Sequence, residues 1–145
     1  MQISSHFTLE ELTLSNTAVR LGIDNSPTQI VIDNLTTLAR GLEEVRLKLG
    51  VPMHINSGYR CAKLNAAVHG VPTSAHISGF AADFIAPEFG TPAEIVHAIA
   101  ESSIQFDQLI VECNAWVHIS FAPAMRRAVL NAAMPNGTMT YTKGE

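Results

Sequence analysis

Two histidines and one aspartate have the residue types and the spacing of a metal site. His76 and Asp83 lie in the segment SAHISGFAAD, and His118 lies in WVHISF, which has the character of a strand. Apolar residues surround Asp83, and a carboxylate buried among them needs a partner or a metal ion. A catalytic zinc site usually has three protein ligands and one open position. We therefore predict that His76, Asp83 and His118 bind Zn²⁺, with His69 as a rival ligand from the same loop as His76.

A zinc ion in this site would favour hydrolysis of a peptide or amide bond. Two neutral imidazoles and one carboxylate leave the metal a net positive charge, which activates water and polarises a carbonyl group. The reaction also needs a base that takes a proton from water and returns it to the leaving amine. Glu112 is the candidate, because a three-residue hairpin connection would pair it with Trp116 and place it diagonally across from His118 on one sheet face. Asp107 has the opposite parity and should point away from that face.

Two further polar residues suit substrate binding. Arg60 ends the segment SGYR after a predicted strand, and its guanidinium group can hold a carboxylate by two hydrogen bonds. The substrate is therefore expected to carry a free carboxylate. Ser74 lies two residues before His76 and could donate a hydrogen bond to the substrate backbone. Simpler roles stay open for each residue taken alone: a salt bridge for Arg60, a solvated strand end for Glu112 and a helix cap for Ser74.

A long helix in the first half of the chain should support the site. Ser26 as N-cap, Pro27 at the first helical position and Gln29 at the third all favour a helix start. Gly50 should end the helix, and Pro52 prevents its resumption. Apolar residues at spacings of three and four form a stripe that would pack against a sheet: Val31, Leu35, Leu38, Leu42, Val45 and Leu49.

Shorter helices and strands make up the rest of the chain. Thr8 and Glu11 form a capping box for a first helix, and Thr91, Pro92 and Glu94 start another that should end near residue 103. The other expected elements are a loop at 15–25, strands at 53–57 and 81–85, helical turns at 61–68, a loop at 69–76, strands at 107–112 and 116–121, and a second hairpin around 135–137. This order predicts one α+β domain over residues 1–145, with a small antiparallel sheet between the long helix and the site.

The composition argues against several other classes of protein. A net charge of −4 and the lack of a basic run longer than two residues disfavour nucleic acid binding. No apolar stretch approaches the ~20 residues of a membrane span. The N-terminus lacks the features of a secretory signal, so we expect synthesis in the cytoplasm. Cys61 and Cys113 are expected to be buried free thiols rather than a disulfide.

Several of these segments resemble the zinc peptidases of the M15 type, the D-alanyl-D-alanine carboxypeptidase group that cuts D-amino-acid bonds in bacterial cell walls. The match includes SGYR at 57 to 60, the pattern SxHxxGxAxD at 74 to 83 and WVHIS at 116 to 120. FTLEEL near the start and GIDNSP at 22 to 27 are similar to the small phage-associated branch of this family.

The resemblance implies the zinc ligands and the substrate-binding residues named above, an acidic base, and the hedgehog and DD-peptidase type of α+β fold. It further implies a zinc metallopeptidase that hydrolyses D-amino-acid-containing bonds in peptidoglycan stem peptides, as a carboxypeptidase or an endolysin-type endopeptidase. Many members carry the acid three residues before the second histidine, where this chain has Ala115. The assignment of Glu112 as the base therefore rests on the hairpin geometry.

The expected partner is a peptidoglycan peptide with a free carboxylate, and we expect a monomer that acts on the cell wall in phage lysis or as part of a virion. The alternative is a non-catalytic phage structural or wall-binding domain that retains the zinc site. A structural zinc normally has four protein ligands, so a fourth ligand on the metal, for example Cys113 or Glu112, would favour this alternative. A domain without metal would instead need a protein partner for Asp83.

Overall fold

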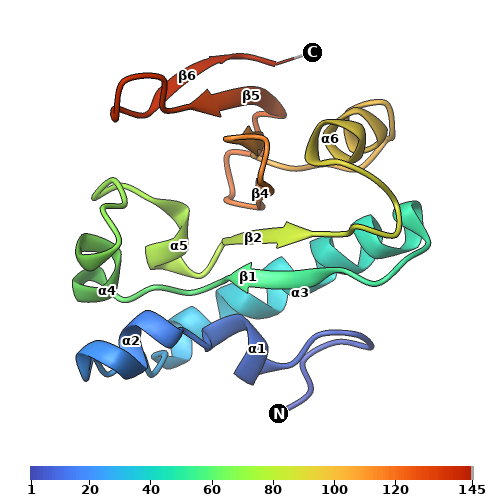
Figure 1. The fold of residues 1–145 in the computed structure, drawn as a ribbon. Helices are drawn as coiled ribbons and strands as arrows, with labels where there is room; N and C mark the ends of the chain where they lie inside the picture. The colour runs from blue at the N-terminus through green and yellow to red at the C-terminus, as the bar shows by residue number, and fades with distance from the viewer. Residues whose placement is uncertain (145) are drawn as a thin grey trace.

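The computed structural model describes residues 1–144 and has an α+β architecture built on one six-stranded sheet (Figure 1). The strand order is β1-β2-β4-β3-β5-β6, and neighbouring strands are antiparallel except for the parallel pair β3 and β5. The strands are β1 (His54–Ser57), β2 (Ala81–Ile85), β3 (Gln108–Glu112), β4 (Trp116–Ser120), β5 (Ala128–Ala133) and β6 (Thr140–Lys143). The predictions of an α+β fold and of two C-terminal hairpins are confirmed. The parallel pair was not predicted.

Six helices lie within the described residues: α1 (Leu9–Thr13), α2 (Asn16–Leu21), α3 (Gln29–Leu49), α4 (Ala62–Ala67), α5 (Ala75–Ser78) and α6 (Pro92–Ala100). Both predicted capping boxes are present, with Thr8 and Glu11 at the start of α1 and Thr91 and Glu94 at the start of α6. Gly50 ends α3 with a φ of 70°, a conformation that glycine adopts without steric cost.

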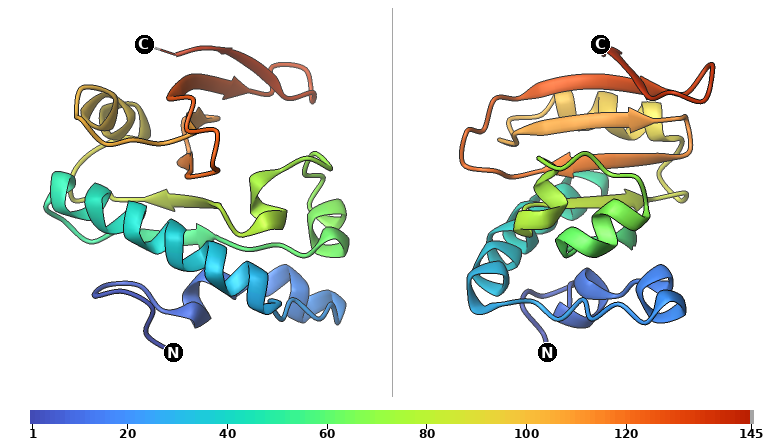
Figure 2. Two further views of the ribbon diagram at one scale, coloured as in Figure 1. Left: turned by 180° about the vertical axis from the view of Figure 1, so that it is seen from behind. Right: turned by 90° about the vertical axis from the view of Figure 1, so that its left-hand side faces the viewer.

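The long helix α3 and the shorter α6 pack on one face of the sheet, while α4 and α5 lie on the other side (Figure 2). The predicted apolar stripe of α3 is buried along its whole length. It shares one core with alternate residues of the central strands, among them Phe84, Leu109, Val117 and Ile119. Side chains at the positions between these residues point to the opposite face of the sheet. That face is where Asp83, Glu112 and His118 lie, as predicted.

The predicted start of α3 is two residues too early. Thr28, rather than Ser26, is the N-cap, and its hydroxyl accepts a hydrogen bond from the N–H of Val31 at 3.4 Å. The backbone N–H of Ser26 instead donates to the carboxylate of Asp24 at 2.9 Å, which forms a local turn. Because this turn holds the backbone before Pro27, the helix begins only after it.

Residues 15–25 are not all loop, because α2 occupies part of this segment. Ser15 caps α2 through a hydrogen bond from the N–H of Ala18, and Gly22 ends it with a φ of 67°. The cap and the glycine are signals in the sequence, but only Ala18 is buried, so no apolar stripe reveals the helix. At α6, the helix ends at Ala100 instead of near residue 103, since the hydroxyl of Ser102 donates to the carbonyl of Ile99.

The two cysteines are free thiols, but the prediction that both are buried is wrong. Cys61 is half-buried at the start of α4, and its sulfur accepts a hydrogen bond from the N–H of Leu64. Cys113 is exposed because it lies at the tip of the β3–β4 hairpin, where its φ is 52°.

Asp107 anchors the segment between β4 and β5. Its buried carboxylate accepts hydrogen bonds from the Nε of Arg126 at 2.8 Å, from the Nη2 at 3.0 Å and from the backbone N–H at 3.1 Å. These bonds hold the pKa of Asp107 below its usual value. As predicted, Asp107 does not join the face that carries Glu112.

Asp107→Asn is expected to lower the Tm at neutral pH by a few degrees, because asparagine loses the charge that Arg126 binds. A lowered carboxyl pKa in the folded state contributes stability above the unfolded pKa of about 4 and loses it as pH falls further. The difference in Tm between wild type and variant should therefore shrink below about pH 4. Thermal unfolding followed from pH 2 to pH 7 checks this, with the exposed Glu88→Gln as the control. A difference that stays constant over this range would contradict the role given to the ion pair.

Candidate metal centre

His76, Asp83 and His118 converge on the sheet face away from α3. Asp83 on β2 and His118 on β4 are paired in the sheet, so their side chains lie side by side, and His76 approaches from α5. The ligand-type atoms of the three side chains all lie within 4.8 Å of one another. The residues are only 2, 7 and 7% exposed, respectively. Such a group of buried nitrogen and oxygen donors is suited to a metal ion.

The short helix α5 places His76 in this group. The loop predicted at 69–76 is therefore shorter than expected, because the hydroxyl of Ser74 accepts a hydrogen bond from the N–H of His76 and caps α5. Gly79 ends α5 with a φ of 82°, and a Cβ atom there would lie 3.1 Å from the backbone oxygen of Val31. Glycine thus permits both the sharp turn after α5 and its close approach to α3.

A backbone carbonyl orients the His76 ring. Nδ1 of His76 lies 2.7 Å from the carbonyl oxygen of Gly58, which can only accept a hydrogen bond. Nδ1 therefore carries the proton, and the lone pair of Nε2 faces Asp83 at 3.2 Å. This arrangement, in which the second nitrogen of a histidine donates to a carbonyl, is common among metal-binding histidines. Burial lowers the pKa of His76, which favours the neutral ring that a metal requires.

The carboxylate of Asp83 lies between the two rings. Its Oδ1 atom is 3.0 Å from Nδ1 of His118 as well as 3.2 Å from Nε2 of His76. Burial alone would raise the pKa of Asp83, but the hydrogen bond from the His118 ring holds it below its usual range. Burial likewise would lower the pKa of His118, but the hydrogen bond to Asp83 raises it. Two imidazoles around one ionised carboxylate fit a divalent cation such as zinc.

Glu112 borders the group, and its predicted position is confirmed. It pairs with Trp116 across the hairpin without a bulge, and its Oε1 lies 3.8 Å from Nδ1 of His118. The indole N–H of Trp116 donates to the other carboxylate oxygen of Glu112 at 2.9 Å. Burial, with the charge of Asp83, raises the pKa of Glu112.

Arg60 lies at the edge of the same group. Its backbone N–H donates to the carbonyl of His76 at 3.0 Å. Its Nε atom is buried and has no hydrogen-bond partner among residues 1–144. Burial lowers the pKa of Arg60, and the negative charges of Asp83 and Glu112 act in the opposite direction. The guanidinium group thus has unused donor capacity beside the predicted metal site.

Two alternatives from the sequence have different outcomes. Ser74 is a helix cap, because its hydroxyl oxygen accepts a hydrogen bond from the N–H of His76. The same hydroxyl can still donate a hydrogen bond to a substrate, so the predicted binding role stays a prediction. His69 lies on an exposed loop with a φ of 62°, and within the described chain it is not part of the metal-type group. The sequence did not identify Gly58 as the partner of His76 or Trp116 as the partner of Glu112. The contact between Trp116 and Glu112 could have been found, because the strand alternation had already placed both side chains on one sheet face.

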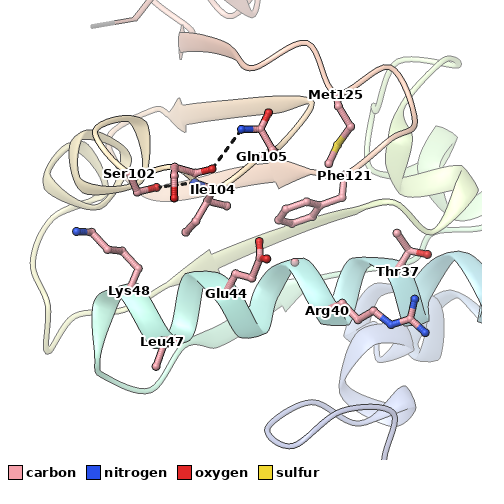
Figure 3. A pocket seen from close by; sticks show the side chains of 12 residues that line it. Thr37, Arg40, Glu44, Leu47, Lys48, Ser102, Ile104, Gln105, Phe121 and Met125 are labelled. Atoms are coloured by element: carbon pink, nitrogen blue, oxygen red, sulfur yellow. Dashed lines mark hydrogen bonds between the residues drawn. The ribbon is translucent and has the colours of Figure 1, made fainter.

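A cavity of about 720 Å³ lies elsewhere, between α3 and the segments that flank α6 and β4 (Figure 3). Figure 3 shows Arg40 and Glu44 on α3, Ile104 before β3, and Phe121 and Met125 after β4. None of the predicted site residues lines this cavity. The candidate centre therefore depends on the three-residue group and its neighbours on the other sheet face.

None of the helices in residues 1–144 is both long and apolar enough to span a membrane.

Comparison with known protein families supports the metal-type group. No curated protein matches the chain. A family model described as Peptidase M15 matches residues 5–120, which include the metal-type group, Glu112 and Arg60. M15 peptidases are typically zinc-dependent, and the His-Asp-His group could hold such an ion. The α+β architecture is consistent with the fold of this family. The chain belongs to the M15 peptidase family.

Proposed function

We propose that this M15 peptidase hydrolyses D-amino-acid-containing bonds in peptidoglycan stem peptides. The observation that carries the proposal is the convergence of His76, Asp83 and His118, with Glu112 at their border, on the sheet face away from α3. The segments SGYR, SAHISGFAAD and WVHIS, which resemble the D-alanyl-D-alanine carboxypeptidases, support this substrate class.

In this proposal a nitrogen of His76, a carboxylate oxygen of Asp83 and a nitrogen of His118 would hold the zinc ion. When bound, the ion supplies a Lewis acid that polarises the scissile carbonyl and activates water. The residues of the chain provide the geometry. The bond from Gly58 fixes the His76 ring, and the sheet pairing of β2 with β4 fixes the other two ligands.

Glu112 acts as the base and later as the acid. Its carboxylate takes a proton from the attacking water while the new C–O bond forms, and it gives the proton to the leaving amine as the C–N bond breaks. The indole of Trp116 holds one carboxylate oxygen, so the other oxygen is directed towards His118.

Arg60 binds the free carboxylate of the substrate in this proposal, and Ser74 donates a hydrogen bond to the peptide backbone. The support for Arg60 is its half-buried position and a buried Nε without a partner. A substrate carboxylate would satisfy that donor in the fork geometry that arginine favours.

Arg60→Lys is expected to raise KM by about 10- to 100-fold for a substrate with a terminal carboxylate, with a much smaller change in kcat. Lysine keeps the charge but cannot make two parallel hydrogen bonds to one carboxylate. A substrate with an amidated terminus should remove the difference between variant and wild type. The control is Arg40→Lys on α3, beside the distant cavity. Equal KM values for Arg60→Lys and wild type on the free acid would show that Arg60 does not bind this group.

The direct test of the proposed function is digestion of purified peptidoglycan fragments by zinc-loaded protein, followed by mass spectrometry of the products. We expect released peptides or amino acids that identify a bond next to a D-amino acid. Loss of terminal D-Ala would mark a carboxypeptidase, whereas cleaved crosslinks or L-Ala-D-Glu bonds would mark an endolysin-type endopeptidase. A chelator should stop the reaction, and added zinc should restore it. Intact fragments after incubation with zinc-loaded protein would refute the proposed substrate class.

The setting proposed for this activity is the bacterial cell wall, during phage lysis or at virion entry. The segments FTLEEL and GIDNSP, which are similar to the phage-associated branch, support it. One observation favours the alternative of a non-catalytic wall-binding or structural domain: Glu112 lies 3.8 Å from His118 and has the right atom type for a fourth zinc ligand. The Glu112 variant described below separates the two functions.

A further inference from the structure

The β5–β6 hairpin extends the sheet beyond the residues that the family model matches. The match ends at residue 120, whereas β5 and β6 cover Ala128–Ala133 and Thr140–Lys143. β5 pairs along β3, the strand that carries Glu112, and β6 forms the outer edge (Figure 1). This hairpin thus adds a surface next to the proposed base.

The strand register places Tyr141 of β6 in line with Glu112. Ala132 pairs with Glu112 on one side and with Tyr141 on the other. Side chains of paired residues point to the same face of a sheet, so Tyr141 shares the face of the metal-type group. Neighbouring strands are about 4.8 Å apart, which puts the Tyr141 backbone roughly 10 Å from that of Glu112. Only the small side chain of Ala132 stands between them in this row.

The phenol of Tyr141 is available to a ligand. The residue is 48% exposed, and its hydroxyl has no hydrogen-bond partner among residues 1–144. Burial of the ring raises the pKa of Tyr141, and the charges of Glu112 and Asp83 act in the same direction. The hydroxyl is therefore protonated at neutral pH and can donate a hydrogen bond.

Tyr141 and Arg60 lie on opposite sides of the centre. Arg60 follows β1 at one edge of the sheet, Tyr141 lies on β6 at the other edge, and the strands with Asp83, His118 and Glu112 are between them. A peptide whose carboxylate reaches Arg60 would therefore extend its other end towards β6. That end contains the residues on the acyl side of the scissile bond.

We propose that Tyr141 is a substrate-binding residue whose hydroxyl donates a hydrogen bond to the acyl-side part of the stem peptide. This inference rests on the proposed function and on the placement of Arg60 at the carboxylate end. It predicts that Tyr141 distinguishes long stem peptides from short ones that share the same scissile bond.

The test compares wild type with Tyr141→Phe, which keeps the ring and removes the hydroxyl. The probes are N-acetylmuramoyl-pentapeptide and the short N-acetyl-D-Ala-D-Ala, with equilibrium binding by calorimetry and kcat/KM as readouts. We expect binding of the long probe to weaken by about 3- to 10-fold, and binding of the short probe to stay the same. The control Thr140→Ala, on the opposite face of β6, should bind both probes as wild type does. Zinc content and Tm report whether each variant is folded.

The outcomes separate this inference from the proposed function. Unchanged binding of the long probe by Tyr141→Phe, or an equal loss for both probes, would overturn the role of Tyr141 even if the enzyme is active. If wild type binds the long probe but releases no product, the proposed function fails, and the binding data still decide the role of Tyr141. A wild-type protein that does not bind the long probe at all would overturn the inference as well.

Discussion

His118→Ala is expected to remove bound zinc and peptide hydrolysis together. His118 contributes one of only two imidazoles in the metal-type group, and its Nδ1 lies 3.0 Å from the Asp83 carboxylate. Two remaining ligands cannot hold the three-ligand geometry of a catalytic zinc site. Since a catalytic metal supplies several kcal/mol of transition-state stabilisation, the rate should fall by about 10³-fold or more. Zinc content by atomic absorption and turnover on peptidoglycan fragments measure the two losses.

Thermal unfolding provides an independent readout of the same site. A ligand that binds only the folded state stabilises it by about 2.7 kcal/mol at 100 times its Kd, which corresponds to roughly 5–10 °C for a chain of this size. Chelation should therefore lower the Tm of wild type, and it should leave the Tm of His118→Ala unchanged. The control is His69→Ala, because His69 is the rival ligand on the exposed loop. Full zinc occupancy in His118→Ala, or its loss in His69→Ala, would contradict the proposed ligand set.

Glu112→Gln is expected to keep one zinc ion and to lower kcat by about 10²- to 10⁴-fold. Glutamine has nearly the same shape, and its amide oxygen can still accept the hydrogen bond from Trp116. It cannot, however, take a proton from water. The loss should therefore fall on kcat, with little change in zinc content or in Tm. Steady-state kinetics together with metal analysis on the same preparation check this expectation.

The same variant separates an enzyme from a structural zinc domain. If Glu112 were a fourth ligand, its replacement would weaken zinc binding and lower the Tm, and wild type would have no turnover to lose. Glu44→Gln, at an exposed position of α3, is the matched control for a lost carboxylate. Normal turnover by Glu112→Gln would rule out Glu112 as the proton carrier, even with the zinc site intact.

Much of the secondary structure could be predicted because its signals are local. The capping boxes of α1 and α6 each lie within four residues, and the apolar stripe of α3 follows from helical periodicity alone. The hairpin of β3 and β4 has a short connection, so pairing parity placed Glu112 and His118 on one face. Predictions were wrong where a neighbouring side chain competed for the backbone, as Asp24 does before α3 and Ser102 does after α6.

The sequence by itself determined the residue types of the candidate centre and the strands that carry two of its members. The short segments SAHISGFAAD and WVHIS made this possible, because they contain His76, Asp83 and His118 in a pattern typical of metal ligands. The tertiary structure alone decided how they meet. The carbonyl of Gly58 selects one nitrogen of His76, and the pairing of β2 with β4 joins Asp83 to His118. The parallel pairing of β3 with β5 places Tyr141 of β6 in one row with Glu112. Each of these contacts joins residues far apart in the chain. Such contacts depend on how elements pack against one core, and no local pattern of residues encodes them.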